Sequence, residues 1–455
     1  MATVVNSALD LFRAPPTDTS IHAYRMVTIQ PTTTGINPME FIVPALDSFV
    51  DLSRSYFTLE LRLKKSDNGN LVAAEKLWPV NNLAHSIFKQ IDLHLNGTLI
   101  SPQSDTYHYK AYLENLINYD RSDGKTVLKP VGWYNAIDSP PEWTNNNTDS
   151  TSGGGGHNDY KALTANHKAA LAAMEEETAH YAGGKTRALV FRPHLEVFYM
   201  SKALVPGVEI KMKFHFNSPN LFLNGVALAG RLKEEDVKMR FHLCQLRLNE
   251  TVYMNLTAKR HNQGAVAMYP TLRSEIRTFS MENTKTRFEI RDLFQNRVPD
   301  RVIVGLLDSR AFNGAVTRDP FCFQKFDLTS LKQVVKGEEY PYETLELIGN
   351  DSSRDLLGYF RFLQASGAWC KHKGNMVEGD DWGQGSGCTL FMIDNVANGC
   401  ADSRNLNPKQ SGDQQLKLEF RASPASNITI LVYGEFENLI EIDPNGALLY
   451  DIYQH

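Results

Sequence analysis

One pattern of strand, turn and helix occurs twice in this chain, and no other feature of the sequence limits the fold as strongly. In the first half, the strand-like run Phe88–Leu95 leads into a turn at Asn96–Gly97. The aromatic residues Tyr107 and Tyr109 then open a helix-like segment that ends near Asn118. Asn-Gly is a strong hairpin signal, because a type I′ turn needs positive φ at both central residues.

The second half repeats this order. Leu331–Val335 is strand-like and leads into a turn at Lys336–Gly337. Tyr340 and Tyr342 follow, and a helix-like segment then runs over Asp355–Gln364. The repeat predicts two similar domains rich in β-structure.

Strand-like runs are frequent in both halves of the chain. Thr58–Lys64 and Glu209–Phe216 alternate polar and apolar residues, which is the period of a strand with one face in a core. Each half has about eight short runs bounded by turn residues and one long interruption. We therefore predict an all-β double jelly roll. It would consist of two antiparallel sandwiches, each of about eight strands, with short helices and long loop insertions.

The length of 455 residues suits two domains of about 200 residues each. We predict an N-terminal arm over residues 1–20, a first jelly roll over 21–255 and a second over 256–455. A loop insertion is expected at about 135–185 in the first roll, and a long loop at about 367–412 in the second.

The 135–185 segment breaks the strand spacing of the first half. It contains the glycine run Gly153–Gly156 and an Ala-rich helix candidate over Tyr160–Tyr181. We interpret it as one long surface loop that tolerates change. Deleting residues 145–183 is accordingly expected to leave assembly intact.

Charge and cysteine content exclude several classes of protein. The net charge of −5 gives no global basic field that would hold nucleic acid by releasing counterions. The N-terminus lacks a secretion signal, and no run reaches the ~20 apolar residues of a membrane helix. An odd and sparse set of cysteines predicts free thiols in a reducing compartment: Cys244, Cys322, Cys370, Cys388 and Cys400.

Two stretches carry partial binding motifs. Gly184–Thr186 resembles the end of a phosphate-binding loop, but a helix precedes it and a strand follows, which reverses the order that such a loop requires. Cys370, His372, Cys388 and Cys400 could supply four zinc ligands, but their spacing matches none of the usual paired-cysteine sites. We predict no cofactor and no metal.

The remaining candidates also favour structural roles. Gly383–Gly387 fails the nucleophile-elbow pattern because Gln384 stands where glycine is needed. Asp380 and Asp381 lie in a polar loop, where solvated charge is the default. Three histidines on strand-like runs are expected to be satisfied residues of a sandwich: His94, His215 and His242. We predict no catalytic, cofactor-binding or metal-binding residues, and no enzyme.

Several runs resemble the hexon-like major capsid proteins of Polinton/Maverick elements and adintoviruses. They keep their order and spacing over most of the chain, apart from the 135–185 and 367–412 segments. The runs are Ser7–Ile21, Phe49–Arg54, Asn81–Gly97, Tyr107–Ile117, Ala311–Gly314, Pro320–Phe321 and Tyr433–Asp443.

The resemblance implies a double jelly roll that stands upright in an icosahedral viral shell. Three chains would form a pseudo-hexagonal homotrimer, since two rolls per chain give six similar sides. Its partners would be neighbouring trimers, penton proteins and minor capsid proteins, around double-stranded DNA that is enclosed without sequence-specific binding. Its location would be the virion, after assembly inside the host cell, in the nucleus. The two long loops would face outward and the arm, residues 1–20, would lie at the base.

Two other functions stay open from the sequence. Trp369 and Trp382 lie in an expected loop, and aromatic faces stack well on sugars. This pattern is compatible with a minor capsid or attachment protein whose sandwiches bind carbohydrate or a receptor. A glycan hydrolase would need two carboxylates at a fixed separation, and nothing in the sequence marks such a pair.

Overall fold

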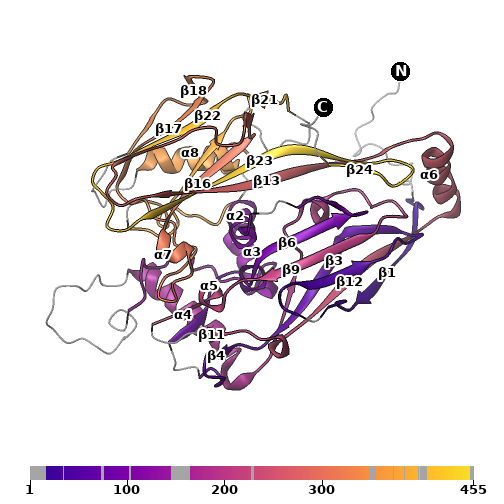
Figure 1. Ribbon diagram of the computed structural model, residues 1–455, viewed down its shortest axis with the longest axis horizontal. Coiled ribbons are helices and arrows are strands. Elements are labelled where there is room, and N and C mark those ends of the chain that lie inside the picture. Colours follow the sequence, from indigo (N-terminus) through magenta and orange to yellow (C-terminus); the bar gives the residue numbers. More distant parts are fainter. Residues whose placement is uncertain are drawn as a thin grey trace, which may run out of the picture.

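The computed structural model shows two β-sandwiches packed against each other, one formed by each half of the chain (Figure 1). It describes residues 17–33, 35–72, 76–101, 104–144, 164–226, 230–347, 355–371 (370 and 371 as backbone), 374–383, 385–397, 399 and 407–450.

The first sandwich consists of two four-stranded antiparallel sheets. One sheet has the order β1 (Ile21–Ile29), β12 (Val237–Leu248), β3 (Phe49–Leu61) and β8 (Arg187–Phe191). The other has the order β2 (Met39–Val43), β9 (Ile210–Phe216), β6 (Phe88–Leu95) and β7 (Thr98–Leu99).

The second sandwich has the same plan. One sheet has the order β13 (Ala267–Met281), β23 (Ile428–Ile442), β16 (Arg301–Asp308) and β20 (Leu390–Asp394), with β24 (Leu448–Leu449) added to β23. The other has the order β14 (Arg287–Ile290), β22 (Gln414–Phe420), β17 (Leu328–Val335) and β18 (Glu338–Glu339), with β19 (Leu345–Glu346) added to β17.

Strand order confirms the predicted fold class. If the main strands of each sandwich are numbered along the chain, both sandwiches pair them as 1-8-3-6 and 2-7-4-5, the order of a jelly roll. The repeated turns also coincide: Asn96–Gly97 joins β6 to β7, and Lys336–Gly337 joins β17 to β18. All four turn residues have positive φ, as a type I′ hairpin requires.

Short elements fill the connections between the main strands. The two-stranded ribbons are β4 (Lys64–Lys65) with β11 (Gly230–Arg231), β5 (Leu77–Pro79) with β10 (Leu223–Gly225), and β15 (Arg297–Val298) with β21 (Gln410–Ser411). The α-helices are α1 (Leu83–Ser86), α2 (Tyr107–Asn118), α3 (Arg121–Lys125), α4 (Ala165–Ala179), α5 (Pro219–Phe222), α6 (Glu250–Asn262), α7 (Ser309–Phe312), α8 (Leu356–Ser366) and α9 (Ala368–Lys371). The 3-10 turns are η2 (Lys129–Val131), η3 (Ala182–Gly184), η4 (Glu196–Tyr199) and η5 (Glu234–Asp236).

Alternating side chains fill each sandwich, as the sequence period predicts. Along β9, every second residue is buried. Phe57 lies at the centre of the first core, where its ring stacks on Phe241 with centroids 4.4 Å apart and meets Phe214 edge to face. The buried apolar residues of both sandwiches form one continuous cluster, so the two halves share a core.

Helix α6 connects the two sandwiches, and the predicted boundary between residues 255 and 256 falls within it. Every residue of α6 is at least partly exposed to solvent. Figure 1 shows this helix at one end of the molecule, beside the start of β13.

The 135–185 segment differs from the expected surface loop. The predicted helix exists as α4, but Met174 is fully buried and packs in a small apolar cluster with Trp78, Tyr134 and Trp143. The buried residues of α4 recur at helical spacing, but only Ala170 and Met174 among them are apolar; the others are His167, Glu177 and Thr178. Deleting residues 145–183 would expose this cluster, so we now expect that deletion to cost soluble protein. Residues 145–163, including the Gly153–Gly156 run, lie outside the described residues.

The 367–412 segment also differs from a long exposed loop. It contains β20, where the strand-like run Thr389–Ile393 predicts a strand, and it also contains the buried residues Met376 and Trp382, which a long exposed loop would not. The backbone amide of Met376 donates to the carbonyl of Leu116 on α2, at 3.0 Å. Because part of this segment packs against the core, few of its residues can be substituted without loss of packing. The polar composition of the segment did not reveal this burial.

Candidate assembly surfaces and the junction between the sandwiches

The residues with partial binding motifs are not brought together by the fold. Helix α4 precedes Gly184–Thr186 and strand β8 follows it, so the order is the reverse of a phosphate-binding loop, as the sequence predicted. Lys185 and Thr186 are exposed to solvent at this connection.

The four proposed zinc ligands cannot all be placed. Cys388 is a free, fully buried thiol, whereas His372, Cys400 and the side chain of Cys370 lie outside the described residues. Burial raises the pKa of the Cys388 thiol well above its ordinary value. Over the described ranges, no group of three or more histidine, cysteine and acidic side chains is placed to hold a metal ion.

The acidic pair in the polar loop has two different environments. Asp380 is exposed, but Asp381 is buried and forms an ion pair with Arg121, which also contacts Glu378 at 3.0 Å. Solvated charge was therefore the wrong expectation for Asp381. It anchors helix α3 of the first half to the 374–383 segment of the second.

Strand histidines occupy the satisfied positions that the sequence predicted in two of three cases. His215 contacts Asp92 at 3.1 Å, and His242 lies 3.1 Å from the hydroxyls of both Thr28 and Thr58. His94 is half-buried on β6, and its Nδ1 has no hydrogen-bond partner among the described residues.

The two tryptophans that suggested sugar binding have opposite environments. Trp369 is 59% exposed, but Trp382 is fully buried and its indole N–H donates to the carbonyl of Leu390 at 2.8 Å. A sugar cannot stack on a ring that is already covered on both faces. The structure therefore contradicts a carbohydrate site that uses Trp382.

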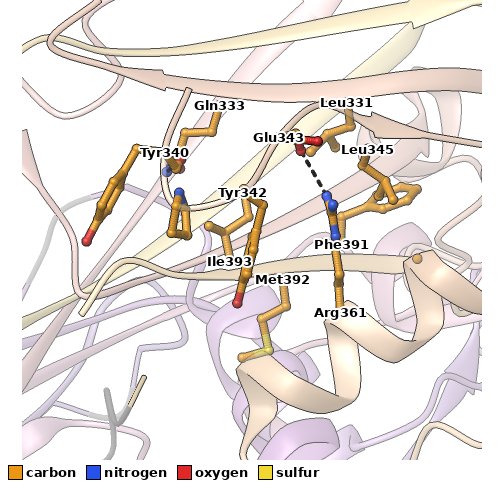
Figure 2. A pocket seen from close by; sticks show the side chains of 12 residues that line it. Leu331, Gln333, Tyr340, Tyr342, Glu343, Leu345, Arg361, Phe391, Met392 and Ile393 are labelled. Atoms are coloured by element: carbon orange, nitrogen blue, oxygen red, sulfur yellow. Dashed lines mark hydrogen bonds between the residues drawn. The ribbon is translucent and has the colours of Figure 1, made fainter. Parts of the chain in front are cut away.

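A narrow cleft lies between β17, β20 and helix α8 (Figure 2). Arg361 reaches from α8 across the ring of Tyr342 and donates to the carbonyl of Glu343 at 3.1 Å. The free space is only about 20 Å³, which is room for about one water molecule. The cleft is thus filled by its own side chains.

Helix α2 forms the centre of the junction between the two sandwiches. Ten of its twelve residues are buried, and the rings of Tyr109 and Tyr112 face the second half of the chain. Tyr109 stacks on Phe312 with centroids 5.6 Å apart, and Tyr112 stacks on Phe321 at 4.1 Å. This packing is that of a protein core, so the two sandwiches are joined by close side-chain packing.

A buried charge network lies on the side of α2 that faces the second sandwich. Lys110 contacts Glu196 at 2.9 Å, and His194 contacts Glu114 at 2.5 Å. The hydroxyl of Tyr433, on β23, donates to Glu114 at 3.1 Å. Burial acts to lower the pKa of Lys110, but Glu196 and Glu114 raise it above its ordinary value, so the lysine stays charged.

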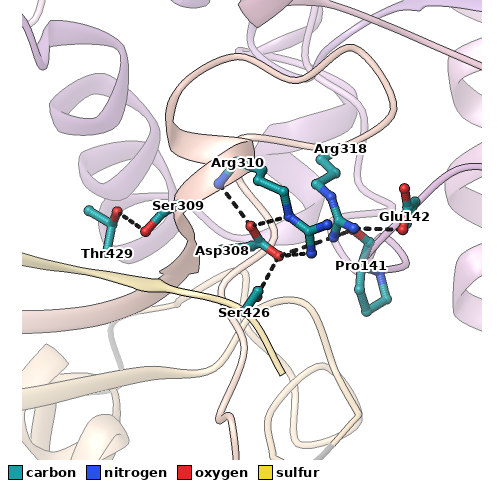
Figure 3. A network of polar contacts seen from close by, with 8 residues as sticks. All are labelled: Pro141, Glu142, Asp308, Ser309, Arg310, Arg318, Ser426 and Thr429. Carbon is teal, nitrogen blue, oxygen red and sulfur yellow. Dashed lines mark hydrogen bonds and ion pairs between the residues drawn. The ribbon is translucent and has the colours of Figure 1, made fainter. Parts of the chain in front are cut away.

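A second polar network ties the N-terminus of α7, where Asp308 is the N-cap residue, to the first half of the chain (Figure 3). Asp308 accepts from Arg310 at 2.9 Å, from Arg318 at 3.2 Å and from Ser426 at 2.8 Å. Arg318 also donates to Glu142 at 2.6 Å, across the junction. Burial acts against the charge of Asp308, but the bonds from Arg310 and Ser426 hold its pKa below the ordinary value.

Buried histidines at the junction predict a loss of stability in acid. Burial lowers the pKa of His108 and His194 from 6.5 to about 3, so both stay neutral in the folded protein down to that pH. In the unfolded chain these histidines bind a proton below pH 6.5. Their contribution to the free energy of unfolding is therefore fully present above pH 6.5 and is lost as pH falls toward 3. At pH 5 the loss is about 2 kcal/mol for each histidine.

Thermal unfolding followed from pH 8 to pH 5 checks this expectation. The raised pKa values of Glu114 and Asp300 act in the opposite direction, because those carboxyls gain protons on folding. The comparison that isolates the histidines is therefore His108→Phe against the wild type, and the variant should lose less stability between pH 7.5 and pH 5. Equal pH slopes for the two proteins would contradict this assignment.

Several large apolar side chains are exposed to solvent, which the sequence pattern did not indicate. Leu356 and Leu357 on helix α8 are 72% and 53% exposed, and Tyr24 on strand β1 is 63% exposed. Met254 on α6 is exposed as well. Large exposed apolar side chains that lie together mark protein–protein contacts more often than isolated ones do.

No helix in the described part of the chain is long and apolar enough to span a membrane.

Comparisons with known proteins agree with this architecture. No protein-family model matches the chain. An uncharacterized protein of Caenorhabditis elegans, F54H12.2, is 22% identical over 453 residues, which cover 94% of this chain and 97% of that protein.

Several solved structures share the fold over nearly the whole chain. A chain of the PBCV-1 virus capsid aligns with a TM-score of 0.57 and 12% identity, covering 96% of this chain and 98% of its own length. A chain of the Sputnik virophage gives 0.56 and 11% identity, with 99% and 93% covered. The mavirus major capsid protein gives 0.54 and 11% identity, with 99% and 94% covered. At these identities the likeness shows that the chain has the double jelly-roll fold of these proteins.

Proposed function

We propose that this chain is a viral major capsid protein that acts by self-association, as a homotrimer that tiles an icosahedral shell. The observation that carries the proposal is the exact repeat of one jelly-roll strand order in two sandwiches joined by a rigid core. A trimer of such chains presents six similar sides, which is the shape needed to fill a hexagonal lattice. The likeness to chains of viral capsids over nearly the full length supports the same function.

The finer assignment is to the hexon-like proteins of the Polinton/Maverick–adintovirus type. It is supported by the motif runs quoted above, which extend from Ser7–Ile21 to Tyr433–Asp443. We also propose residues 21–255 and 256–455 as the two rolls and residues 1–20 as an arm that contacts neighbouring proteins.

The proposed partners follow from a place in a shell. They are copies of the same chain, neighbouring trimers, penton proteins and minor capsid proteins. The net charge of −5 suits a wall that encloses double-stranded DNA without binding it by sequence. The proposed site of assembly is the nucleus of the host cell, and the proposed final location is the virion.

Size-exclusion chromatography with light scattering tests the proposal on the full chain. We expect a particle of three times the 51.2 kDa of one chain, and hexagonal outlines by negative-stain electron microscopy. A stable monomer at micromolar concentration, with no larger particle in the images, would overturn the proposed function.

A further inference from the structure

The turn between β6 and β7, Asn96–Gly97, joins two residues that are able to react with each other. Asparagine before glycine deamidates more readily than other asparagines, because glycine has no side chain to hinder attack by its backbone nitrogen. That nitrogen loses its proton to solvent and bonds to Cγ of asparagine, and the side-chain nitrogen leaves as ammonia. One water molecule then opens the succinimide ring, which leaves aspartate or isoaspartate.

The attacking nitrogen of Gly97 is open to solvent. The sequence has six Asn-Gly pairs, and five of them lie within the described residues. In four of these five the glycine N–H already donates to an oxygen of the protein: Gly69 to Asp67 Oδ1, and Gly225, Gly314 and Gly446 to the carbonyls of Val316, Ala311 and Asp443. Over the described residues, the N–H of Gly97 has no such acceptor, and a Cβ at Gly97 would meet nothing within 4 Å. Of the five glycines, Gly97 therefore gives up its proton to solvent most easily.

The side chain of Asn96, by contrast, is fixed by two hydrogen bonds. Its Oδ1 accepts from the backbone N–H of Glu209 at 2.8 Å, and its Nδ2 donates to the carbonyl of Gly446, also at 2.8 Å. Ring closure needs a rotation of this side chain toward Gly97 and a change in the left-handed conformation of the turn, where φ of Asn96 is 47°. That movement breaks the two bonds, so the folded chain exposes the nitrogen but holds the amide away from reaction.

One of these two bonds comes from the second roll. Gly446 lies in the turn between β23 and β24, and Asp443 holds that turn in place. The carbonyl of Asp443 accepts from the N–H of Gly446 at 3.1 Å, and its Oδ1 accepts from the N–H of Ala447 at 2.7 Å. Glu209 immediately precedes β9 and belongs to the first roll. The bond to Gly446 is therefore the one that depends on contact between the two rolls.

We propose that Asn96 is a deamidation site and that the second roll controls its reaction through the carbonyl of Gly446. While the two turns are in contact, the amide of Asn96 stays intact. When they separate, the nitrogen of Gly97 attacks Cγ of Asn96, and aspartate or isoaspartate forms with release of ammonia. The reaction is not reversed in water, so a modified residue 96 identifies a chain whose rolls have come apart at this point.

The product of deamidation cannot restore the contact. A carboxylate at position 96 has no N–H to donate, so the bond to the Gly446 carbonyl is lost and two oxygens face each other. Isoaspartate also adds one carbon to the backbone of the turn, which a type I′ hairpin does not accommodate. Deamidation therefore weakens the contact that had prevented it, and the two turns stay apart.

Peptide mapping by mass spectrometry on the full-length chain tests the proposal. The folded protein and the same protein in urea are incubated at pH 8, and the conversion of Asn96 is followed with time. We expect Asn96 to react roughly tenfold or more slowly in the folded chain, because reaction requires local opening. Gly446→Ala should remove most of this protection, since its Cβ would lie 3.1 Å from Nδ2 of Asn96 and its φ of +86° strains alanine.

Two other Asn-Gly pairs are controls within the same digest. Asn68 and Asn313 are exposed, and their rates should be the same in the wild type and in Gly446→Ala. Asp443→Ala is a second variant, which loosens the β23–β24 turn without changing Gly446, and it should also speed the reaction of Asn96. If Asn96 reacts as fast in the folded wild type as in urea, the proposal is overturned. Wild-type rates at Asn96 in both variants also overturn it.

Discussion

Replacing Trp382 by alanine is expected to lower the free energy of unfolding by about 3–5 kcal/mol, as for other fully buried aromatic residues. Its ring fills the space between Gly358, Tyr359 and Phe391, and its N–H bonds the carbonyl of Leu390. The substitution leaves a cavity between α8 and β20. Urea unfolding followed by intrinsic fluorescence at one protein concentration measures the change.

The control for this substitution is Met254→Ala. Met254 is a large apolar residue, but it is 68% exposed on α6, so its removal should change the free energy of unfolding by about 0.5 kcal/mol or less. If Trp382→Ala also changed stability by so little, the packing of the 374–383 segment described above would be wrong.

Replacing Lys110 by methionine is expected to destabilise the protein by about 3–5 kcal/mol, because it leaves buried carboxylates without their cation. Lys110 lies between Glu196, at 2.9 Å, and Glu114, at 3.9 Å, and its side chain is almost fully buried. A double-mutant cycle with Glu196→Gln isolates the pair. The loss of unfolding free energy in the double variant should be smaller than the sum of the losses in the two single variants.

Lys211→Met is the matched control on the surface. Lys211 lies 3.6 Å from Glu40 and is about one third exposed, and pairs of this kind contribute about 0–1 kcal/mol. Equal losses of unfolding free energy for Lys110→Met and Lys211→Met would contradict a stabilising role for the buried charge network at the junction.

The repeat was visible in the sequence because local chemistry controls it. The two hairpin turns, Asn96–Gly97 and Lys336–Gly337, need positive φ, and alternating runs such as that of β9 specify which face is buried. These signals act over two to eight residues, so they can be recognised without knowing which segments pack against them.

The sequence did not reveal that parts of the 135–185 and 367–412 segments are buried, because the residues that cover them lie elsewhere in the chain. The alanines of α4 hide a buried stripe whose partners, Trp78 and Trp143, are distant in sequence. Trp382 lies among glycines and aspartates that are typical of a loop, yet its neighbours are α8 and β20. Helix α2 gave no such hint either: it contains Lys110, Glu114 and Asn115, yet ten of its twelve residues are buried.

The sequence by itself determined two jelly rolls and the absence of a marked catalytic motif, because strand period and turn conformation are local properties. Only the tertiary structure decided which surfaces the rolls share and which they leave open. The helices α2 and α8 look alike as amphipathic segments, but ten of the twelve residues of α2 are buried, whereas Leu356 and Leu357 of α8 are largely exposed. That difference depends on which roll packs against each helix. Within a single chain, the second roll packs against α2, but no other roll packs against Leu356 and Leu357 of α8.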